Sequence, residues 1–306
     1  MSKREDAAWR LIEESFAIEA EEAAKAGKLA YMARVFAMTS LPYRDPGELP
    51  GWSRTNGALE LVMQPGLQRD PAGALVSAGY PYGVIPRLLL AWISTEAVRT
   101  KERELVLGRS LSSFMRKLGM APTGGAKRGN IGRLRDQTRR LLKARIATMW
   151  TLPNGGGVGE IEAHMDVAEE WRLWWDPKAP DVEGLLESSI TLTPRFFNEM
   201  TQRPVPIDLR AVEALRRCAM RLDVYMWLTH RMSYLSRPTT VSWQQLRLQF
   251  GSTLADTPEG RAKFRSRFTE HLCRVQIVYP AANVDVTDRG LVLRPSATHV
   301  RRREAR

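Results

Sequence analysis

The chain has 306 residues and a formal net charge of +12, with 46 lysines and arginines against 34 aspartates and glutamates. This length allows two domains with separate cores, and the basic excess favours a polyanion such as nucleic acid as the partner. No apolar run approaches the ~20 residues of a membrane span and no signal sequence follows Met1, so we expect a cytoplasmic protein with no membrane contact.

The first predicted helix covers residues 5–26 and is rich in alanine and glutamate. Its apolar residues recur at intervals of three and four, which predicts a packed side of Trp9, Ile12, Phe16 and Ala20. Because the segment is acidic, we expect it to avoid DNA and to pack on the first domain or on a second protomer. Residues 28–38 fit a strand or a short helix, and residues 58–63 fit a strand that could pair with them.

A long apolar helix begins near Pro86, a residue that suits the first turn of a helix. It is apolar on most sides, so we expect it to be the central helix of the first domain. The pattern then predicts, in chain order, a strand over residues 104–107, a helix over 110–118, a turn over 120–125 and a basic helix over 127–145.

The helix over residues 127–145 has eight basic residues against one acid, a net charge of +7. Its apolar residues form one stripe that faces a core: Ile131, Leu134, Thr138, Leu141 and Leu142. Opposite the stripe, the helical wheel predicts an outer face of Arg133, Gln137 and Arg140 flanked by Arg139 and Lys143. Because arginines on such a face suit the DNA major groove, we predict DNA contacts from Lys127, Arg128, Arg133, Gln137, Arg139, Arg140 and Lys143. The alternative is an ordinary solvated basic face.

Two β-type runs, residues 146–152 and 158–167, flank a glycine-rich turn and predict a hairpin of the wing type. Three tryptophans follow at positions 171, 174 and 175. We interpret them as core or interface anchors, with base stacking as the alternative. Residues 187–192 predict another strand and residues 194–202 another helix.

The two prolines in residues 203–206 interrupt both helix and sheet and indicate a hinge between domains. Asp208 is a predicted N-cap for the helices that follow, over residues 209–217 and 220–235. A later helix over residues 258–275 has a strict apolar stripe of Phe264, Phe268 and Leu272. Its outward positions predict a second set of DNA contacts: Lys263, Arg265, Ser266, Arg267, Glu270 and Arg274. Short strands over residues 276–279, 284–286 and 290–293 predict a second wing.

An internal repeat connects the two halves of the chain. Residues 110–119 align without a gap on residues 242–251, with Ser110 and Ser242 as N-caps and a glycine at each end. The predicted buried positions also correspond: Leu111 with Trp243, Phe114 with Leu246 and Leu118 with Phe250. The order of helix, strand, helix, turn, basic helix and hairpin is that of a winged helix, and it occurs twice.

The predicted fold is therefore a helix-rich α+β fold with two tandem winged-helix domains. The predicted boundaries are an N-terminal acidic helix in residues 1–27, a first winged helix in 28–203, a second in 204–298, and a basic, disordered tail in 299–306.

Sequence signatures of catalysis are missing. The glycine cluster at residues 119–127 lacks the Gly-Lys-Ser/Thr ending of a phosphate-binding loop, and the four histidines stand singly. His271 and Arg274 fit the His-x-x-Arg pattern of tyrosine recombinases, but Tyr279 follows too closely to be an independent nucleophile. Cys218 and Cys273 lie in predicted helices, where free cysteines usually pack. We expect no catalytic residue, no metal site and no cofactor.

Several segments resemble the plasmid-encoded RepA-type replication initiators. In the first half these are residues 80–100 (YPYGVIPRLLLAWISTEAVRT), 104–108 (ELVLG), 122–125 (PTGG) and 133–142 (RLRDQTRRLL). In the second half they are residues 204–210 (PVPIDLR), 223–228 (DVYMWL) and 242–251 (SWQQLRLQFG). The resemblance covers roughly residues 28–296 and leaves out the first helix and the tail.

The resemblance implies a protein that binds direct repeats, called iterons, in double-stranded DNA at a plasmid origin. Such initiators melt adjacent DNA and recruit the host initiator and replicative helicase. They also often repress their own gene. In this family the C-terminal winged helix contacts bases, whereas the N-terminal one contacts the backbone and can mediate a homodimer. The alternatives are a winged-helix transcriptional repressor and a partition or nucleoid protein that binds DNA without sequence preference.

Overall fold

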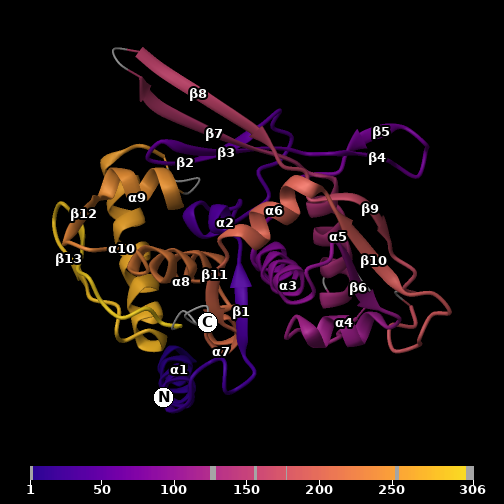
Figure 1. Cartoon of the computed structure of the whole chain (residues 1–306), viewed down its shortest axis with the longest axis horizontal. Helices are drawn as coiled ribbons and strands as arrows, with labels where there is room; N and C mark the ends of the chain where they lie inside the picture. The colour runs from indigo at the N-terminus through magenta and orange to yellow at the C-terminus, as the bar shows by residue number, and fades with distance from the viewer. Residues whose placement is uncertain (1–2, 125–128, 155–156, 177, 252–254, 301–306) are drawn as a thin grey trace. The chain divides into compact units, whose positions relative to one another are not determined.

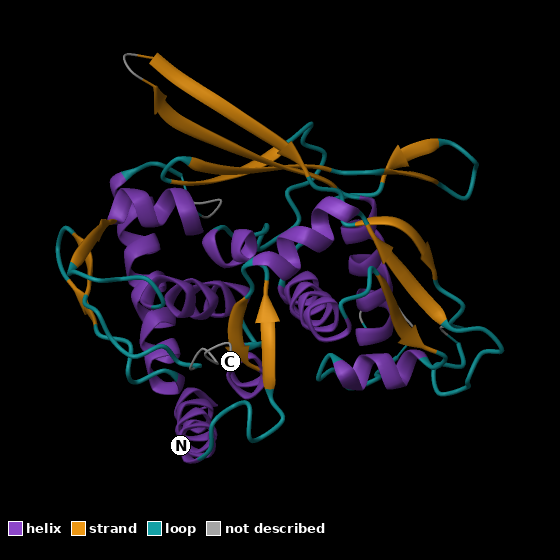
Figure 2. Cartoon of the chain, viewed as in Figure 1, coloured by secondary structure: helices purple, strands orange, loops and turns teal. Residues whose placement is uncertain are grey.

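The structure is a computed structural model that describes residues 3–124, 129–154, 157–176, 178–251 and 255–300. Helices and strands alternate irregularly along the chain, and most strand pairs are antiparallel hairpins or short sheets, so the fold is α+β as predicted (Figures 1 and 2). The chain divides into two compact units. Residues 41–204 form the central unit, and residues 1–40 together with 205–306 form the terminal unit.

The central unit is built around α3 (Val84–Thr100), which packs on α5 (Asn130–Lys143) and α6 (Pro194–Gln202). Eleven residues of α3 are buried, which agrees with a central helix that is apolar on most sides. The buried Arg87 fixes its first turn, because the guanidinium donates to the carbonyl oxygens of Leu41 and Gly83 at 2.8 and 2.6 Å. A short helix, α4 (Leu111–Lys117), precedes α5.

Three sheets complete the central unit. The largest has the order β2-β3-β7-β8, from β2 (Trp52–Asn56), β3 (Leu59–Gln64), β7 (Arg145–Asn154) and β8 (Gly157–His164). The second has the order β6-β10-β9, from β6 (Glu104–Gly108), β10 (Ser188–Leu192) and β9 (Ala168–Arg172). The third is the hairpin of β4 (Leu67–Arg69) and β5 (Leu75–Ser77). The predicted hairpin β7–β8 is confirmed, with Ala147 opposite His164 and Leu152 opposite Gly159.

The terminal unit is mainly helical. Its helices are α1 (Lys3–Ala20), α2 (Arg34–Met38), α7 (Leu209–Leu215), α8 (Ala219–Met232), α9 (Trp243–Phe250) and α10 (Pro258–Val278). Its strands are β1 (Leu29–Met32), β11 (Val205–Asp208), β12 (Thr239–Ser242), β13 (Val284–Val286) and β14 (Gly290–Leu293). The helix α8 packs on α10 and α2, and the predicted stripe Phe264, Phe268 and Leu272 of α10 is fully buried.

Both copies of the internal repeat form the predicted helix. Ser110 caps α4 by accepting a hydrogen bond from the Ser113 amide, and Ser242 forms a capping box with Gln245 at the start of α9. The two strands that precede these helices pair differently. In the terminal unit, β12 joins the wing strands in the order β12-β14-β13, whereas in the central unit β6 pairs with β10 and not with β7–β8.

The chain divides differently from the predicted boundaries at its N-terminal side. Residues 28–40 were assigned to the first domain, but they lie in the terminal unit. The cause is β1, which pairs along its whole length with β11, so that Ala30 lies opposite Ile207. The strand over residues 58–63 exists, as β3, but the prediction that it pairs with residues 28–38 is wrong, because its partners are β2 and β7.

The predicted packed side of the first helix is wrong. Trp9 and Phe16 are 59% and 65% exposed, and the buried positions are Leu11, Ser15 and Ile18. The helix has two apolar stripes. The stripe with the smaller side chains, Leu11, Ser15 and Ile18, packs on α10 and α7.

The C-terminal region also differs from the prediction. The helix α10 continues to Val278, so residues 276–278 do not form a strand. The predicted start of the disordered tail at His299 is wrong, because His299 is hydrogen-bonded to Tyr225 and Val300 is buried. Residues 301–306 lie outside the described residues. Cys218 is half-buried as expected, whereas Cys273 is exposed. No helix among the described residues is long and apolar enough to span a membrane.

Candidate nucleic-acid interface

The helix α5 displays arginines on the solvent side of the central unit. Its predicted stripe is confirmed, since Ile131, Leu134 and Leu141 are at most 3% exposed. Arg133, Arg135 and Arg139 are exposed, and no described residue forms an ion pair with any of them. Three unpaired guanidinium groups on one helix offer charge and hydrogen-bond donors to an external polyanion.

Gln137 does not lie on this outer face. It is 4% exposed, and its side-chain oxygen accepts a hydrogen bond from the Tyr82 amide at 2.8 Å. The helical-wheel prediction is therefore wrong for Gln137, because the segment before α3 covers that flank of the helix. Its carboxamide satisfies a backbone amide and is not available to a DNA base.

Arg140 is turned inward as well. Its guanidinium is ion-paired with Asp45 at 2.8 Å and with Asp136 at 3.0 Å, and it also donates to the Tyr80 carbonyl oxygen. Burial, the largest single influence, lowers the pKa of Arg140. The contributions of the two carboxylates together outweigh it, so the pKa is raised above its usual value. Gly79 makes room for this group: its φ is +76°, and a Cβ there would lie 2.5 Å from the Arg140 Nη1. The predicted outward orientation of Arg140 is wrong.

The remaining predicted DNA contacts of the first basic helix differ in their exposure to solvent. Arg139 is exposed, as predicted for a flank. The ammonium group of Lys143 donates to the Leu67 carbonyl oxygen at 2.8 Å, which holds the half-buried side chain against the start of β4. Lys127 and Arg128 lie outside the described residues.

The helix α10 presents the corresponding surface of the terminal unit. Lys263, Ser266 and Arg267 are exposed, and within the described chain no carboxylate pairs with Lys263 or Arg267. Their spacing of three and four residues places them on one face, opposite Phe264 and Phe268. Thr257 caps the helix by accepting from the Gly260 amide, and Pro258 occupies the first turn, so this face begins on a well-defined helix end.

Arg265 is held against the wing. Its guanidinium lies over the Trp243 ring at 5.1 Å and donates to the fully exposed Asp288 carboxylate at 2.7 Å. The Trp243 indole donates in turn to the Thr287 carbonyl oxygen at 3.0 Å. These contacts join α9, α10 and the β13–β14 turn at one point. Asp288 is a surface partner, which a phosphate could replace at little cost because exposed ion pairs are weak.

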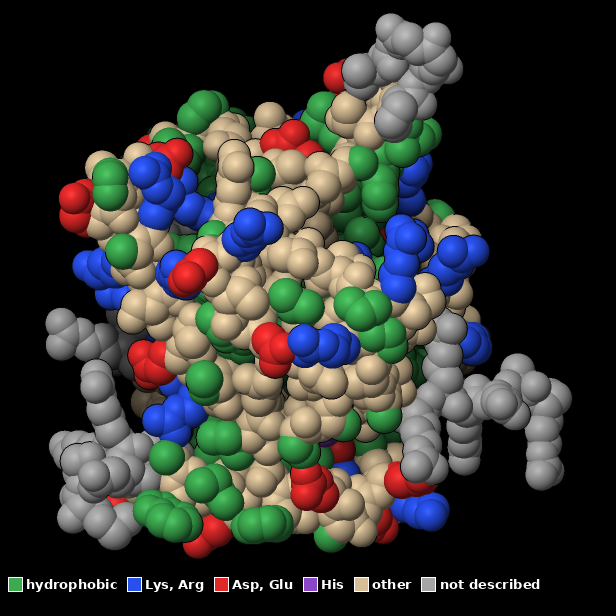
Figure 3. Space-filling view, turned by 90° about the vertical axis from the view of Figure 1, so that its left-hand side faces the viewer, with side chains coloured by type: hydrophobic (Ala, Val, Ile, Leu, Met, Phe, Trp, Pro, Cys, Tyr) green, Lys and Arg blue, Asp and Glu red, His purple; other side chains and the backbone are tan. Residues whose placement is uncertain are grey.

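Glu270 and Arg274 lie on the same side of α10 as Lys263, Ser266 and Arg267, nearer the C-terminal end of the helix. Both line a cavity whose other lining residues come from α1, α7, α8 and the α7–α8 turn. Figure 3 shows the surface on the α10 side of Figure 1, where Lys and Arg side chains are interspersed with acidic ones and do not form a single large patch.

Arg135 is not among the predicted DNA contacts, yet it is exposed and has no ion-pair partner among the described residues. The signal was present in the sequence, because Arg135 and Arg139 are four residues apart and therefore share a face. The helical wheel instead places the outer face of the helix around Arg133, Gln137 and Arg140.

An α+β chain with an outward arginine-bearing helix in each of two units has the features of a nucleic-acid-binding protein. Comparison with known families gives a more specific result. Residues 80–245, just over half of the chain, match the family model described as plasmid encoded RepA protein. The chain therefore belongs to the family of plasmid-encoded RepA proteins, which are plasmid replication initiators. Membership of this family implies that the protein binds DNA.

Two solved structures resemble the chain. One is a structure of selenomethionine derivatives of domains 2 and 3 of RctB, with a TM-score of 0.50 and 11% identity over 83% of this chain and 95% of that one. The other, of RctB domains 2–3, has a TM-score of 0.46 and 12% identity over 78% of this chain and 82% of that one. At 11% identity the first likeness shows a shared fold. No curated protein matches the chain.

Proposed function

We propose that this RepA-family protein binds origin iterons in double-stranded DNA sequence-specifically and acts without catalysing a covalent step. Bound copies would melt adjacent DNA, recruit the host initiator and replicative helicase, and repress the protein's own gene. The observation that carries the proposal is the exposed trio Lys263, Ser266 and Arg267 on one face of α10. An Arg with a neighbouring hydroxyl and ammonium group can supply both a bidentate base contact and phosphate contacts.

The order of elements supports a winged-helix arrangement in the terminal unit. The helix α8, strand β12, helices α9 and α10, and strands β13 and β14 follow one another, and the three strands form one sheet. In such an arrangement α10 would enter the major groove and the β13–β14 turn would approach the backbone. In the central unit, α5 followed by the β7–β8 hairpin would supply the backbone contacts, and the unit would also provide the homodimer contact.

The decisive experiment is footprinting and quantitative titration of the protein on the DNA that flanks its gene. Arg267→Ala should weaken specific binding by about 1–3 kcal/mol if Arg267 contacts a base, and should relax the preference for one base pair of the repeat. Arg237→Ala is the matched control, since Arg237 is an exposed arginine of the same unit outside α10.

The alternatives give different footprints. Protection of direct repeats supports initiation, whereas protection confined to an inverted repeat over the promoter would indicate a repressor alone. Uniform binding along the DNA, with no protected site and no effect of Arg267→Ala on sequence preference, would contradict the proposal.

A further inference from the structure

Five arginines line a cavity in the terminal unit, and Lys263, Ser266 and Arg267 are not among its lining residues. The cavity has a volume of about 390 Å³ and is lined by residues of α1, α7, α8 and α10 and of the α7–α8 turn. This volume lies within the ~300–1,000 Å³ typical of small-molecule sites. The arginines are Arg10, Arg216, Arg217, Arg221 and Arg274.

The positive charge of these arginines is only partly balanced by the protein. Three glutamates line the same cavity, Glu14, Glu213 and Glu270, which leaves a net charge of +2. Within the described chain, one of these glutamates forms an ion pair with a cavity arginine: Glu213 lies 3.6 Å from Arg216. The other four guanidinium groups have no carboxylate partner among the described residues, so each keeps donors for a ligand.

His271 lies beside the cavity and is in contact with one of its arginines. The Arg221 Nε atom donates to its Nδ1 at 3.4 Å. Burial lowers the pKa of His271, and the positive charges of Arg221 and Arg267 lower it further against the opposing effect of Glu270. The contributions of Arg221 and Arg267 are those expected of a positive field, which would attract an anion.

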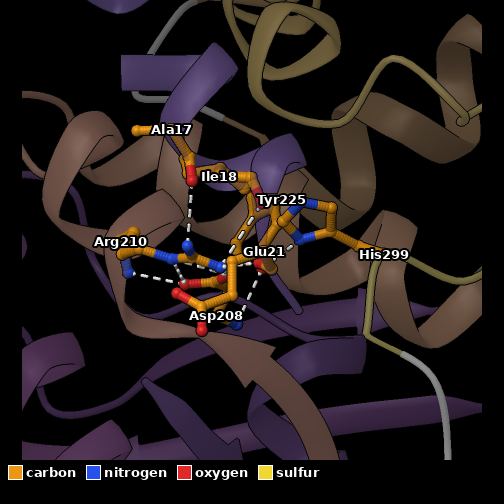
Figure 4. A network of polar contacts seen from close by, with 7 residues as sticks. All are labelled: Ala17, Ile18, Glu21, Asp208, Arg210, Tyr225 and His299. Atoms are coloured by element: carbon orange, nitrogen blue, oxygen red, sulfur yellow. Dashed lines mark hydrogen bonds and ion pairs between the residues drawn. The ribbon is translucent and has the colours of Figure 1, made fainter. Parts of the chain in front are cut away.

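The walls of the cavity are fixed by contacts elsewhere in the unit. Residues 10, 11 and 14 of α1 form one wall, and Arg210 ties the last turn of α1 to the rest of the unit (Figure 4). Arg210 donates to the carbonyl oxygens of Ala17 and Glu21 at 3.0 and 2.7 Å, and it is ion-paired with the buried Asp208 at 2.7 Å. These contacts fix the end of α1 against the start of α7, and α1 supplies one wall of the cavity.

We propose that this cavity binds a nucleotide, with its phosphate groups on the arginines and its sugar hydroxyls or base amino groups on the glutamates. Arginine is well suited to phosphate because its planar donors match the geometry of phosphate oxygens. The glutamates favour a nucleotide over a backbone phosphate of DNA, since carboxylates accept hydrogen bonds from the ribose hydroxyl groups, which a DNA backbone lacks. This assignment gives Glu270 and Arg274 a role apart from DNA contact and goes beyond the proposed origin binding.

The test is isothermal titration of the full-length protein, in the absence of origin DNA, with ATP, ADP, pyrophosphate, adenosine and a short single-stranded oligonucleotide. We expect ATP and ADP to bind with a Kd below about 1 mM and adenosine not to bind, because it lacks phosphate. Arg221→Gln and Arg274→Gln should each weaken nucleotide binding about tenfold or more, since each removes charge-assisted donors to phosphate. Arg237→Gln, a change at an exposed arginine outside the cavity, should leave binding unchanged.

A second variant separates loss of the ligand from loss of the fold. Glu14→Gln removes a carboxylate but keeps all the arginines, so it should strengthen binding of pyrophosphate and reduce the preference for ADP over pyrophosphate. The proposal is overturned if neither nucleotide binds at millimolar concentration, or if the arginine variants bind as well as the unchanged protein while circular dichroism shows them folded. Binding of the oligonucleotide alone, with loss in the same variants, would also overturn it and assign the cavity to DNA phosphate. Footprinting of iterons is independent of each of these results.

Discussion

The buried ion pair of Asp208 and Arg210 should be a major contributor to the stability of the terminal unit. The Asp208 side chain is 3% exposed and that of Arg210 is 18% exposed. The carboxylate accepts hydrogen bonds from the Arg210 backbone amide, where it caps α7, and from the guanidinium Nε and Nη2. The same guanidinium donates to three carbonyl oxygens near the end of α1 (Figure 4). We predict that Arg210→Ala is strongly destabilising.

The magnitude follows from what the substitution leaves behind. Removing one partner of a buried pair typically costs about 3–5 kcal/mol, because the other charge remains buried and uncompensated. Since Arg210 is partly exposed, water can reach the vacated space, and the α1 carbonyl groups near the surface can be solvated. We therefore expect a loss near the lower end, about 3 kcal/mol. Asp208→Asn should cost less, because Asn still caps a helix well and the remaining arginine reaches solvent.

Urea unfolding followed by circular dichroism measures these differences, and the double variant Asp208→Asn/Arg210→Ala provides the critical comparison. If the loss in Arg210→Ala comes from an uncompensated carboxylate, neutralising that carboxylate should restore part of it, so the double variant should be more stable than Arg210→Ala alone. If the two losses simply add, or if Arg210→Ala costs less than ~1 kcal/mol, the reasoning is refuted.

Two further predictions concern pH and salt. The His299 Nδ1 atom and the Tyr225 hydroxyl share a hydrogen bond of 2.7 Å, and burial lowers the pKa of His299 below its usual value near 6.5 against the opposing effect of Asp208. Because the folded state resists protonation of His299, its full contribution to the free energy of unfolding should be present above pH ~6.5 and should be lost as the pH falls toward the lowered pKa. In urea titrations from pH 8 to 5, His299→Gln should flatten this dependence. An unchanged slope would contradict the assignment. For DNA binding, Arg135→Ala should reduce the slope of log K against log salt by about one unit with little change in sequence preference, and an unchanged slope would remove α5 from the backbone contacts.

Local sequence patterns predicted the elements that local interactions determine. The strict spacing of Phe264, Phe268 and Leu272 identified the buried side of α10, and the Ser110 and Ser242 caps fixed the starts of α4 and α9. In each case the information is local to one helix, where side chains three or four residues apart share a face.

Long-range contacts determined the features that the patterns missed. The pairing of β1 with β11 joins residues more than 170 positions apart in the sequence, such as Ala30 and Ile207, and no periodicity specifies it. The first helix had two apolar stripes of similar length, so its own sequence could not show which one packs. The choice depends on the surfaces of α7 and α10, which accommodate Leu11 and Ile18 and leave Trp9 exposed.

The basic helix α5 shows why a charge pattern is weaker evidence for a site than an apolar pattern is for a core. Its buried stripe was correct, but its polar residues divide between two uses: Arg140 neutralises Asp45 and Asp136 within the unit, whereas Arg133 and Arg135 remain exposed. An apolar residue gains free energy in only one environment, while an arginine is satisfied equally by water, an internal carboxylate or a phosphate. The position of Asp45, 95 residues before Arg140, therefore decides which arginines remain available to DNA. That position becomes known only once the chain is folded.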